Sequence, residues 1–380
     1  MKELPQKLQQ KLEKRIAQDN FRQLSVAEER IDFSSNDYLG WADNQAIKKK
    51  AEGILKKTSI NRSGATGSRL LTGNHVLYEW AERKIAKIHH TPEALIFNSG
   101  YVANLGLLAT VPQRGDIIFY DALCHASIRE GIALSAAKSY KFQHNNLEDL
   151  EILVSRHSPN DGICYLVTES VFSMDGDAPD LPRLVAFCDA HSIRLIIDEA
   201  HALGVVGSGK GWIFEHTLTD TIFATVITFG KALGQHGAAI LCGNDLKDYL
   251  VNFARSFIYT TGLPPHTVAG IIAAYQQLQT VPSEIQQLQQ RIGFFKDEIN
   301  RLRLDAYFQW NPSAIQICQL SGSRHTKSIA LKLQNQGYDV RPILAPTVPE
   351  GKERLRFCIH AFNTEEEITD VLTALATFVG

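Results

Sequence analysis

The sequence predicts an α/β protein, in which a large domain built on a mainly parallel β-sheet is joined to a smaller α+β domain. Two observations predict this class. From Glu93 onward, short apolar runs alternate with helical patterns, which is typical of repeated strand–helix units. After about Pro282 the alternation ends, and a long helix rich in glutamine and charged residues begins. With 380 residues, 44% of them hydrophobic and 21% charged, the chain is long enough for both domains.

The predicted strands of the large domain are short apolar runs rich in β-branched residues. In chain order they are EALIF (93–97), DIIFY (116–120), ICYLVTE (163–169), RLIIDEA (194–200), TVITF (225–229) and AAILC (238–242). In a parallel sheet, ligands bind beyond the carboxyl ends of the strands. Polar residues that directly follow these runs are therefore the candidates for a functional site.

The smaller domain is predicted from the pattern after residue 282. Its elements are a helix at 283–303, a strand at 313–320, a helix at 326–337, strands at 338–343 and 354–359, and a final helix at 364–379. We expect three parts: an N-terminal segment, 1–45, that packs with the small domain, the large domain, 46–282, and the small domain, 283–380. The sequence contains no linker rich in proline, glycine or serine, so we expect the domains to pack closely.

Composition excludes several classes of partner. The formal net charge is -2, with 39 basic and 41 acidic residues, so the basic excess that binds nucleic acid or an anionic membrane is absent. No run approaches the roughly 20 apolar residues that span a bilayer. The N-terminus has charges throughout and no signal-peptide core. Its six cysteines are dispersed without a C-x-x-C pair, so we expect free thiols, no metal site and a cytoplasmic protein.

Lys231 lies in the stretch TFGKALGQHGAAIL, residues 228–241, between two predicted strands. Most lysines are solvated surface charges, but a lysine in a tight connection between core strands is partly desolvated. Desolvation lowers the proton affinity of an amine, which can then act as a nucleophile and form a Schiff base. The sequence therefore predicts a reactive lysine at this position.

Asp198 ends an apolar strand, where an isolated carboxylate is destabilising without a cationic partner. The pyridinium nitrogen of pyridoxal phosphate (PLP) would be such a partner. PLP chemistry needs a lysine, a carboxylate at the ring nitrogen, a cradle for the phosphate and a group packed on the ring. Candidates for the other roles follow further strands: Ser99, Gly100 and Tyr101 at a helix N-terminus, His125 for the ring face, Glu169 and Ser173, and His201 for the ring hydroxyl.

Each candidate also has a structural interpretation. His125 could be a capping histidine, Asp198 a helix N-cap and Ser173 a turn residue, and only their concurrence at successive strand ends favours a site. RLIIDEAH (194–201) and GVVGSGKG (204–211) resemble the acidic box and phosphate loop of a nucleotide hydrolase. Their order is wrong for that class, and Gly211 stands where a hydroxyl ligand for magnesium is required. We therefore interpret these glycines as a flexible turn.

An ordered series of motifs along nearly the whole chain resembles the α-oxoamine synthase family of fold-type I PLP-dependent transferases. The motifs are FSSNDYLG (33–40), GATGSRLLTGN (64–74), FNSGYVAN (97–104), HASIREG (125–131), VTESVFSMDGD (167–177), IDEAH (197–201), TFGKALG (228–234) and IYTTGLPP (258–265). The resemblance implies a seven-stranded sheet in the large domain, PLP as the cofactor, and a homodimer with its sites at the interface.

The resemblance also implies residue roles. For the cofactor, it assigns Lys231 to the covalent bond, Asp198 to the ring nitrogen, His125 to the ring face, Gly100 and Tyr101 to the phosphate, Ser173 and His201 to the ring oxygen, and Thr228 to the phosphate or the lysine loop. For the substrates, it assigns Arg356 to the carboxylate of the amino acid with Asn36 nearby, and Arg22 and Thr347 to the acyl group. HALG at 201–204 departs from the family pattern and leaves the shape of that loop open.

Within the family, TFGK, IYTTGLPP and RPILAPTVPEGKERLRFCI (341–359) resemble members that join L-alanine to a pimeloyl thioester with loss of carbon dioxide. The thioester could be pimeloyl-CoA or a pimeloyl-acyl carrier protein. Members that use glycine, such as 2-amino-3-ketobutyrate ligases, or longer acyl chains remain an alternative. A PLP aminotransferase would share the lysine and the aspartate. A non-enzymatic binding protein is disfavoured because every candidate catalytic position holds a competent residue.

Overall fold

The structure is a computed structural model that describes residues 3–18, 20–24, 29–157, 159, 161–280, 283–309 and 311–379. The chain forms two compact units. The terminal unit comprises Met1–Ser35, Arg291–Ile359 and Asn363–Gly380, and the central unit comprises Asn36–Gln290 and His360–Phe362. The division into three parts that the sequence suggests stays a prediction.

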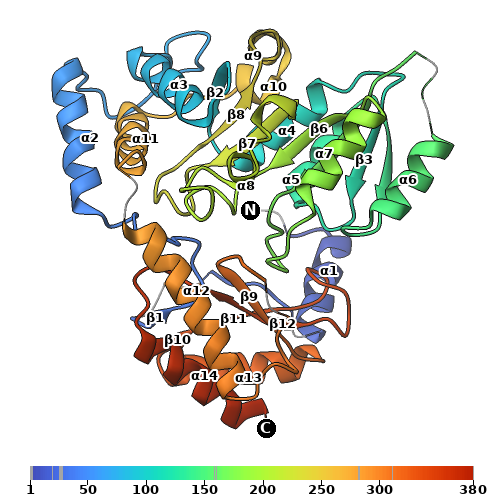
Figure 1. Cartoon of the computed structure of the whole chain (residues 1–380), viewed down its shortest axis with the longest axis vertical. Helices are drawn as coiled ribbons and strands as arrows, with labels where there is room; N and C mark the ends of the chain where they lie inside the picture. Colours follow the sequence, from blue (N-terminus) through green and yellow to red (C-terminus); the bar gives the residue numbers. More distant parts are fainter. Residues whose placement is uncertain are drawn as a thin grey trace. The chain divides into compact units, whose positions relative to one another are not determined.

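A seven-stranded β-sheet runs through the described part of the central unit (Figure 1). Its strands lie in the order β2 (Glu93–Phe97), β8 (Ala238–Cys242), β7 (Ala224–Thr228), β6 (Arg194–Asp198), β5 (Cys164–Glu169), β3 (Ile117–Asp121) and β4 (Lys138–Phe142). β8 is antiparallel to both of its neighbours, and the other neighbouring pairs are parallel. The predicted mainly parallel sheet is confirmed, and β2 through β7 all end at the same edge.

Hydrophobic side chains fill both faces of this sheet, because successive residues of a strand point to opposite sides. Leu166 of β5 and Leu195 of β6 belong to a buried cluster that includes residues of α6 (Leu147–Arg156) and α7 (Leu181–Ala190). Their neighbours Val167 and Ile196 belong to a second cluster, which includes residues of α4 (Gly100–Thr110) and α5 (Ala126–Leu134). Strands buried on both faces explain the nearly continuous apolar runs in the sequence.

The other helices of the central unit surround this sheet. They are α2 (Gln45–Thr58), α3 (Val76–His89), α8 (Trp212–Glu215), the 3-10 helix at Thr219–Thr221, α9 (Asn244–Phe253), α10 (Arg255–Ile258) and α11 (Pro265–Leu278). In Figure 1, α2 and α11 lie side by side towards the β2 end of the sheet. At the other end of the sheet, α6 contacts β4. Asn44, Ser99, Asn146 and Asp180 cap α2, α4, α6 and α7 by accepting hydrogen bonds from first-turn N–H groups.

The terminal unit combines short strands with four helices of the described chain. β9 (Ile315–Gln319), β12 (Arg354–Cys358) and β11 (Arg341–Ile343) form an antiparallel sheet, and β1 (Ile31–Asp32) pairs in parallel with β10 (Tyr338–Asp339). The helices are α1 (Gln6–Ala17), α12 (Ser283–Arg301), which begins in the central unit, α13 (Ser323–Asn335) and α14 (Glu365–Val379). The rings of Phe295, Phe308 and Phe357 pack together with centroids 5.7 to 5.9 Å apart.

The GVVGSGKG stretch forms a turn, and Lys210 within it forms an antiparallel bridge with Leu203, the residue that precedes the stretch. The shape of this turn depends on Glu199, a buried residue whose Oε1 accepts hydrogen bonds from the N–H groups of Trp212 and Ile213 at 2.8 and 3.1 Å. All six cysteines are free thiols, as predicted. Within the described residues, no helix has both the length and the apolar character that a bilayer crossing requires.

Candidate active site

The residues selected from the sequence gather at the carboxyl edge of the central sheet. Gly100 follows β2, and His125 follows β3. His201 follows β6 and Lys231 follows β7, each three residues after the strand ends. Parallel strands bring these segments to one edge although they are far apart in the sequence.

Lys231 lies in a tight turn after β7. The N–H of Phe229 donates to the Gly237 carbonyl at 2.9 Å, and the N–H of Gln235 donates to the Phe229 carbonyl at 2.8 Å. Gly234 has φ +59°, and a Cβ at this position would lie 2.2 Å from the backbone nitrogen of Ala42, so the turn requires glycine. The half-buried side chain of Lys231 places Nζ 2.7 Å from Nε2 of His201.

His201 connects this lysine to the SNDYLG motif. The Tyr38 hydroxyl has one proton and donates it to Asn36, so this hydroxyl accepts from Nδ1 of His201, and Nε2 of His201 accepts from Lys231. Nδ1 then donates to Oη of Tyr38 at 2.7 Å, and the Tyr38 hydroxyl donates to Oδ1 of Asn36 at 3.1 Å. Tyr38 is fully buried. A chain of hydrogen bonds therefore runs from Lys231 to Asn36 through His201 and Tyr38.

Asp198 is 6% exposed and ends β6. Its Oδ2 accepts a hydrogen bond from Nδ2 of Asn104 at 2.7 Å, and its Oδ1 accepts one from the N–H of Ala200 at 2.9 Å. Nδ2 of Asn104 also lies 3.1 Å from Oγ of Ser127, which in turn lies 2.8 Å from Nδ1 of His125. One hydrogen-bonded network thus fixes both Asp198 and His125.

His125 is the N-cap residue of α5, where its Nδ1 accepts the N–H of Ser127 at 3.2 Å. Its own N–H donates to Oε1 of Glu169 at 2.6 Å. Burial lowers the pKa of His125, while the Asp198 carboxylate raises it and the Lys231 ammonium lowers it. The edge of the Tyr101 ring approaches His125 with centroids 6.2 Å apart.

Glu169 ends β5 directly beside Asp198, and the two residues are register partners in neighbouring strands. Burial and then the Asp198 carboxylate raise the pKa of Glu169, against the opposing effects of Lys231 and the His125 N–H, to about 8. A buried carboxyl group with this pKa can carry a proton near neutral pH, a property shared by many catalytic acids and bases.

Gly100 and Thr228 meet at the start of α4. A Cβ on Gly100 would lie 3.7 Å from Cβ of Thr228, and Oγ1 of Thr228 donates to the Gly237 carbonyl at 3.1 Å. The first turn of an α-helix presents N–H groups that have no acceptor inside the helix and that attract anions. The side chain of Tyr101 is exposed and donates to Oε2 of Glu130, and this hydrogen bond raises the pKa of Tyr101.

These residues fit the chemical requirements of PLP. The edge of the sheet offers an amine at Lys231 and a buried carboxylate at Asp198, and the hydrogen bond from Asn104 stabilises that carboxylate. Next to them, Thr228 and the N-terminus of α4 form a corner suited to a phosphate. Imidazoles of His125 and His201 complete the set of groups that PLP chemistry uses.

The structure does not describe all predicted residues as one cluster. Ser173 lies in the turn that follows β5. Arg22, Thr347 and Arg356 belong to the terminal unit, where Arg356 is buried in β12 and the N–H of Thr347 donates to the Leu344 carbonyl at 2.9 Å. Their assignment to substrates stays a prediction.

Sequence reasoning missed Tyr38, Asn104 and Ser127 as members of the network. Tyr38 and Asn104 lie inside motifs that carried the family resemblance, SNDYLG and FNSGYVAN. Their partners His201 and Asp198 are 163 and 94 residues away along the chain. The position of Tyr38 and Asn104 inside these motifs was the available signal.

Comparisons with known proteins identify the family of this chain. The family model for aminotransferase class I and II matches residues 28–375. An 8-amino-7-oxononanoate synthase of Emericella nidulans is 40% identical over 370 residues, covering 92% of this chain and 89% of the relative. One from Lysinibacillus sphaericus is 38% identical over 348 residues, covering 90% and 87%.

Solved structures of other proteins share the fold of this chain. A serine palmitoyltransferase of Sphingomonas wittichii superposes with a TM-score of 0.90 at 25% identity, covering 99% of this chain and 98% of that one. A structure of SPT with PLP bound gives 0.89 at 25% identity, covering 98% and 96%. An 8-amino-7-oxononanoate synthase of Francisella tularensis gives 0.77 at 29% identity, covering 93% and 98%. The chain thus has the fold of fold-type I PLP-dependent transferases and belongs to the aminotransferase class I and II family, within which its relatives are α-oxoamine synthases.

Proposed function

We propose that this protein condenses L-alanine with a pimeloyl thioester and forms 8-amino-7-oxononanoate, carbon dioxide and a free thiol, as a step of biotin biosynthesis. The observation that carries the proposal is the identity of 37 to 40% to 8-amino-7-oxononanoate synthases over about nine tenths of the chain. The chemistry at the carboxyl edge supports it, because the lysine, the buried carboxylate and the imidazoles that such a reaction needs are all present.

In this proposal, the cofactor is PLP, and the residues at the sheet edge hold it. Lys231 would bind it covalently, Asp198 would face its ring nitrogen and His125 would cover its ring. Gly100, Tyr101 and Thr228 would hold its phosphate, with Ser173 and His201 at the ring oxygen. When bound, PLP withdraws electrons from the α-carbon of an amino acid and so stabilises a carbanion there.

The side chains of this protein would control the protons and the charges. The Lys231 amine would take the α-proton of L-alanine at Nζ. His201 and Tyr38 keep that amine oriented through hydrogen bonds of 2.7 Å each. Arg356 would bind the alanine carboxylate with a bidentate ion pair, with Asn36 near the same group. His125 would donate a hydrogen bond to the oxyanion that develops on the thioester carbonyl.

The acyl substrate in this proposal is a pimeloyl thioester. Arg22 and Thr347 are proposed to contact the pimeloyl group, whose thiol is either CoA or an acyl carrier protein. We also propose a homodimer in the cytoplasm. The six free thiols support a reducing compartment, and light scattering of the purified protein would test the dimer.

Thiol release by PLP-loaded protein tests the reaction. With pimeloyl-CoA, release should depend on L-alanine, and glycine should not replace it. Release with glycine alone would move the function to another α-oxoamine synthase. If pimeloyl-CoA is inactive, a pimeloyl-acyl carrier protein tests the other thioester, and failure of both with L-alanine contradicts the proposal.

A separate experiment tests the lysine. Borohydride reduction of the loaded protein should fix PLP on the peptide that contains Lys231, as detected by mass spectrometry. Lys231→Ala should abolish both this adduct and thiol release. Lys210→Ala is the matched control, because Lys210 lies in the same unit and packs its Nζ 3.9 Å from the Phe214 ring centroid. An adduct retained in Lys231→Ala would refute the assignment.

A further inference from the structure

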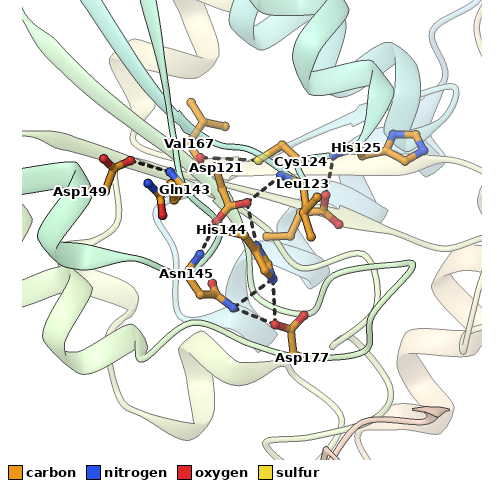
Figure 2. Close-up of polar contacts among 11 residues, drawn as sticks. Asp121, Leu123, Cys124, His125, Gln143, His144, Asn145, Asp149, Val167 and Asp177 are labelled. Carbon is orange, nitrogen blue, oxygen red and sulfur yellow. Dashed lines mark hydrogen bonds and ion pairs between the residues drawn. The ribbon is translucent and has the colours of Figure 1, made fainter. Parts of the chain in front are cut away.

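His144 lies between two carboxylates beside the candidate site (Figure 2). Its Nδ1 is 2.9 Å from Oδ1 of Asp121, and its Nε2 is 2.8 Å from Oδ2 of Asp177. The histidine follows β4, Asp121 ends β3, and Asp177 belongs to the segment after β5. One imidazole ring therefore joins the segments that follow three neighbouring strands at the carboxyl edge.

The contact to Asp121 reaches the segment that carries His125. Asp121 is fully buried, and the oxygen that binds His144 also accepts the N–H of Leu123 at 2.8 Å. Its other oxygen accepts the N–H of Asn145 at 2.8 Å. Because Leu123 is two residues from His125, the position of the Asp121 carboxylate determines how the chain approaches His125.

The contact to Asp177 reaches the segment that carries Ser173. The N–H of Phe172 donates to the backbone carbonyl of Asp177 at 3.0 Å and so closes the turn that contains Ser173. Nδ2 of Asn145 adds a second hydrogen bond to Oδ2 of Asp177, at 2.9 Å. The His144 ring also meets the Phe172 ring edge-on, with centroids 4.4 Å apart. Ser173 is thus held between two residues that both contact His144.

The charge of His144 makes both contacts strong. Burial lowers the pKa of His144, but the hydrogen bonds and charges of Asp121 and Asp177 outweigh burial and raise this pKa to about 10. The ring is therefore an imidazolium at neutral pH, and both of its nitrogens donate. Hydrogen bonds with a charged donor and a charged acceptor are about twice as strong as neutral ones.

We propose that His144 is a positioning residue, which holds the segment with His125 and the segment with Ser173 in fixed register at the carboxyl edge. The roles of His125 and Ser173 in this inference rest on the proposed function. His144 itself touches neither of them, and it acts through Asp121 on one side and through Asp177 and Phe172 on the other. Removing the ring should loosen both segments, whereas removing one of its two donors should loosen one.

Two amide substitutions separate the two contacts. Asparagine places its Nδ2 donor near the position of Nδ1, and glutamine places Nε2 near the other ring nitrogen. His144→Asn should therefore retain the contact to Asp121 and lose that to Asp177, and His144→Gln should do the reverse. His144→Ala loses both. His157→Ala is the matched control, because His157 ends α6 and stacks on Tyr140 with centroids 3.7 Å apart.

Hydrogen–deuterium exchange of the PLP-loaded protein measures each segment. In His144→Ala, the amides of Leu123 and Phe172 should exchange about ten- to a hundredfold faster, as expected for loss of a hydrogen bond between charged groups. In His144→Asn only Phe172 should show this increase, and in His144→Gln only Leu123. His157→Ala should change neither amide. Equal exchange rates in all variants would overturn the proposal. An equal increase at the Leu123 and Phe172 amides in both His144→Asn and His144→Gln would also overturn it.

Kinetics and spectra test whether the position of these two segments affects the reaction. His144→Ala should lower kcat about tenfold or more with KM within about twofold, because small displacements of catalytic groups affect kcat strongly. The visible spectrum of bound PLP should shift in this variant and not in His157→Ala. An unchanged spectrum and unchanged kcat in His144→Ala would refute the positioning role. If the wild type releases no thiol but the exchange and spectral pattern holds, only the proposed function fails.

Discussion

Replacing Glu169 with glutamine should change how the stability of the cofactor-free protein depends on pH. The carboxyl group of Glu169 is buried at the end of β5 and accepts the N–H of His125 at 2.6 Å. Glutamine has nearly the same shape and keeps an oxygen for this hydrogen bond, but it cannot ionise. The substitution therefore isolates the effect of the negative charge at this position.

The sign and the size follow from the pKa. Burial, and then the neighbouring Asp198 carboxylate, raise the pKa of Glu169 from 4.5 to about 8. Between these values the unfolded chain has lost this proton and the folded protein has kept it, so the free energy of unfolding falls as pH rises. One pKa unit corresponds to about 1.4 kcal/mol, so the difference of about 3.5 corresponds to about 5 kcal/mol. The side chain in Glu169→Gln cannot ionise, so the free energy of unfolding of this variant does not fall for this reason.

Urea denaturation of the wild type and of Glu169→Gln, followed by tryptophan fluorescence from about pH 5 to about pH 8, measures this effect. The titrating groups that do not interact with Glu169 are common to both proteins and cancel in the difference between them. The free energy of unfolding of the variant should rise relative to that of the wild type by up to about 1.4 kcal/mol per pH unit. A difference that is constant with pH, or that increasingly favours the wild type, would refute the assignment of a raised pKa.

Two further substitutions test the network and the turn. Tyr38→Phe removes the hydroxyl between His201 and Asn36 and leaves a buried N–H group without its acceptor, so urea denaturation should show a loss of about 1 to 3 kcal/mol. Gly211→Ala introduces a Cβ 2.2 Å from Oε2 of Glu199 at φ +102°, and thermal melting should show a loss of about 2 kcal/mol or more. Gly53→Ala, in a helix with open space around the new Cβ, should instead be stabilising by about 0.5 to 1 kcal/mol. Equal melting temperatures for the two alanine variants would contradict the steric argument. An unchanged free energy of unfolding in Tyr38→Phe would contradict the hydrogen-bonded network.

The sequence predicted the strands that are buried on both faces, because these form short apolar runs between helical patterns. It missed β4, whose residues KSYKF are mostly exposed at the edge of the sheet and include two lysines. The order of the strands could not be predicted either. β8 lies between β2 and β7 although 140 residues separate Phe97 from Ala238, and no local pattern encodes such a neighbour.

Some residues of the candidate site could also be predicted from the sequence, and others could not. Lys231 and Asp198 could be selected because each is a charged residue at the end of an apolar strand, which is unfavourable without a function or a partner. Asn104 could not be selected, because a buried asparagine inside an apolar helix shows its purpose only when its partner, Asp198, is known. The same holds for His144, which the sequence presents as one polar residue in a polar connection.

The pairing of Glu169 with Asp198 explains why this edge suits a cationic ligand. Register places the two acids side by side at the ends of neighbouring parallel strands, where both are buried. Two adjacent carboxylates cannot both ionise without a large penalty, and in this protein the N–H of His125 and the amide of Asn104 each stabilise only one of them. A positive charge at the same edge reduces the repulsion between the two acids, as the Lys231 ammonium does for Glu169 by lowering its pKa. Because these groups are already fixed by hydrogen bonds, a cation would gain this stabilisation without the reorganisation that water requires.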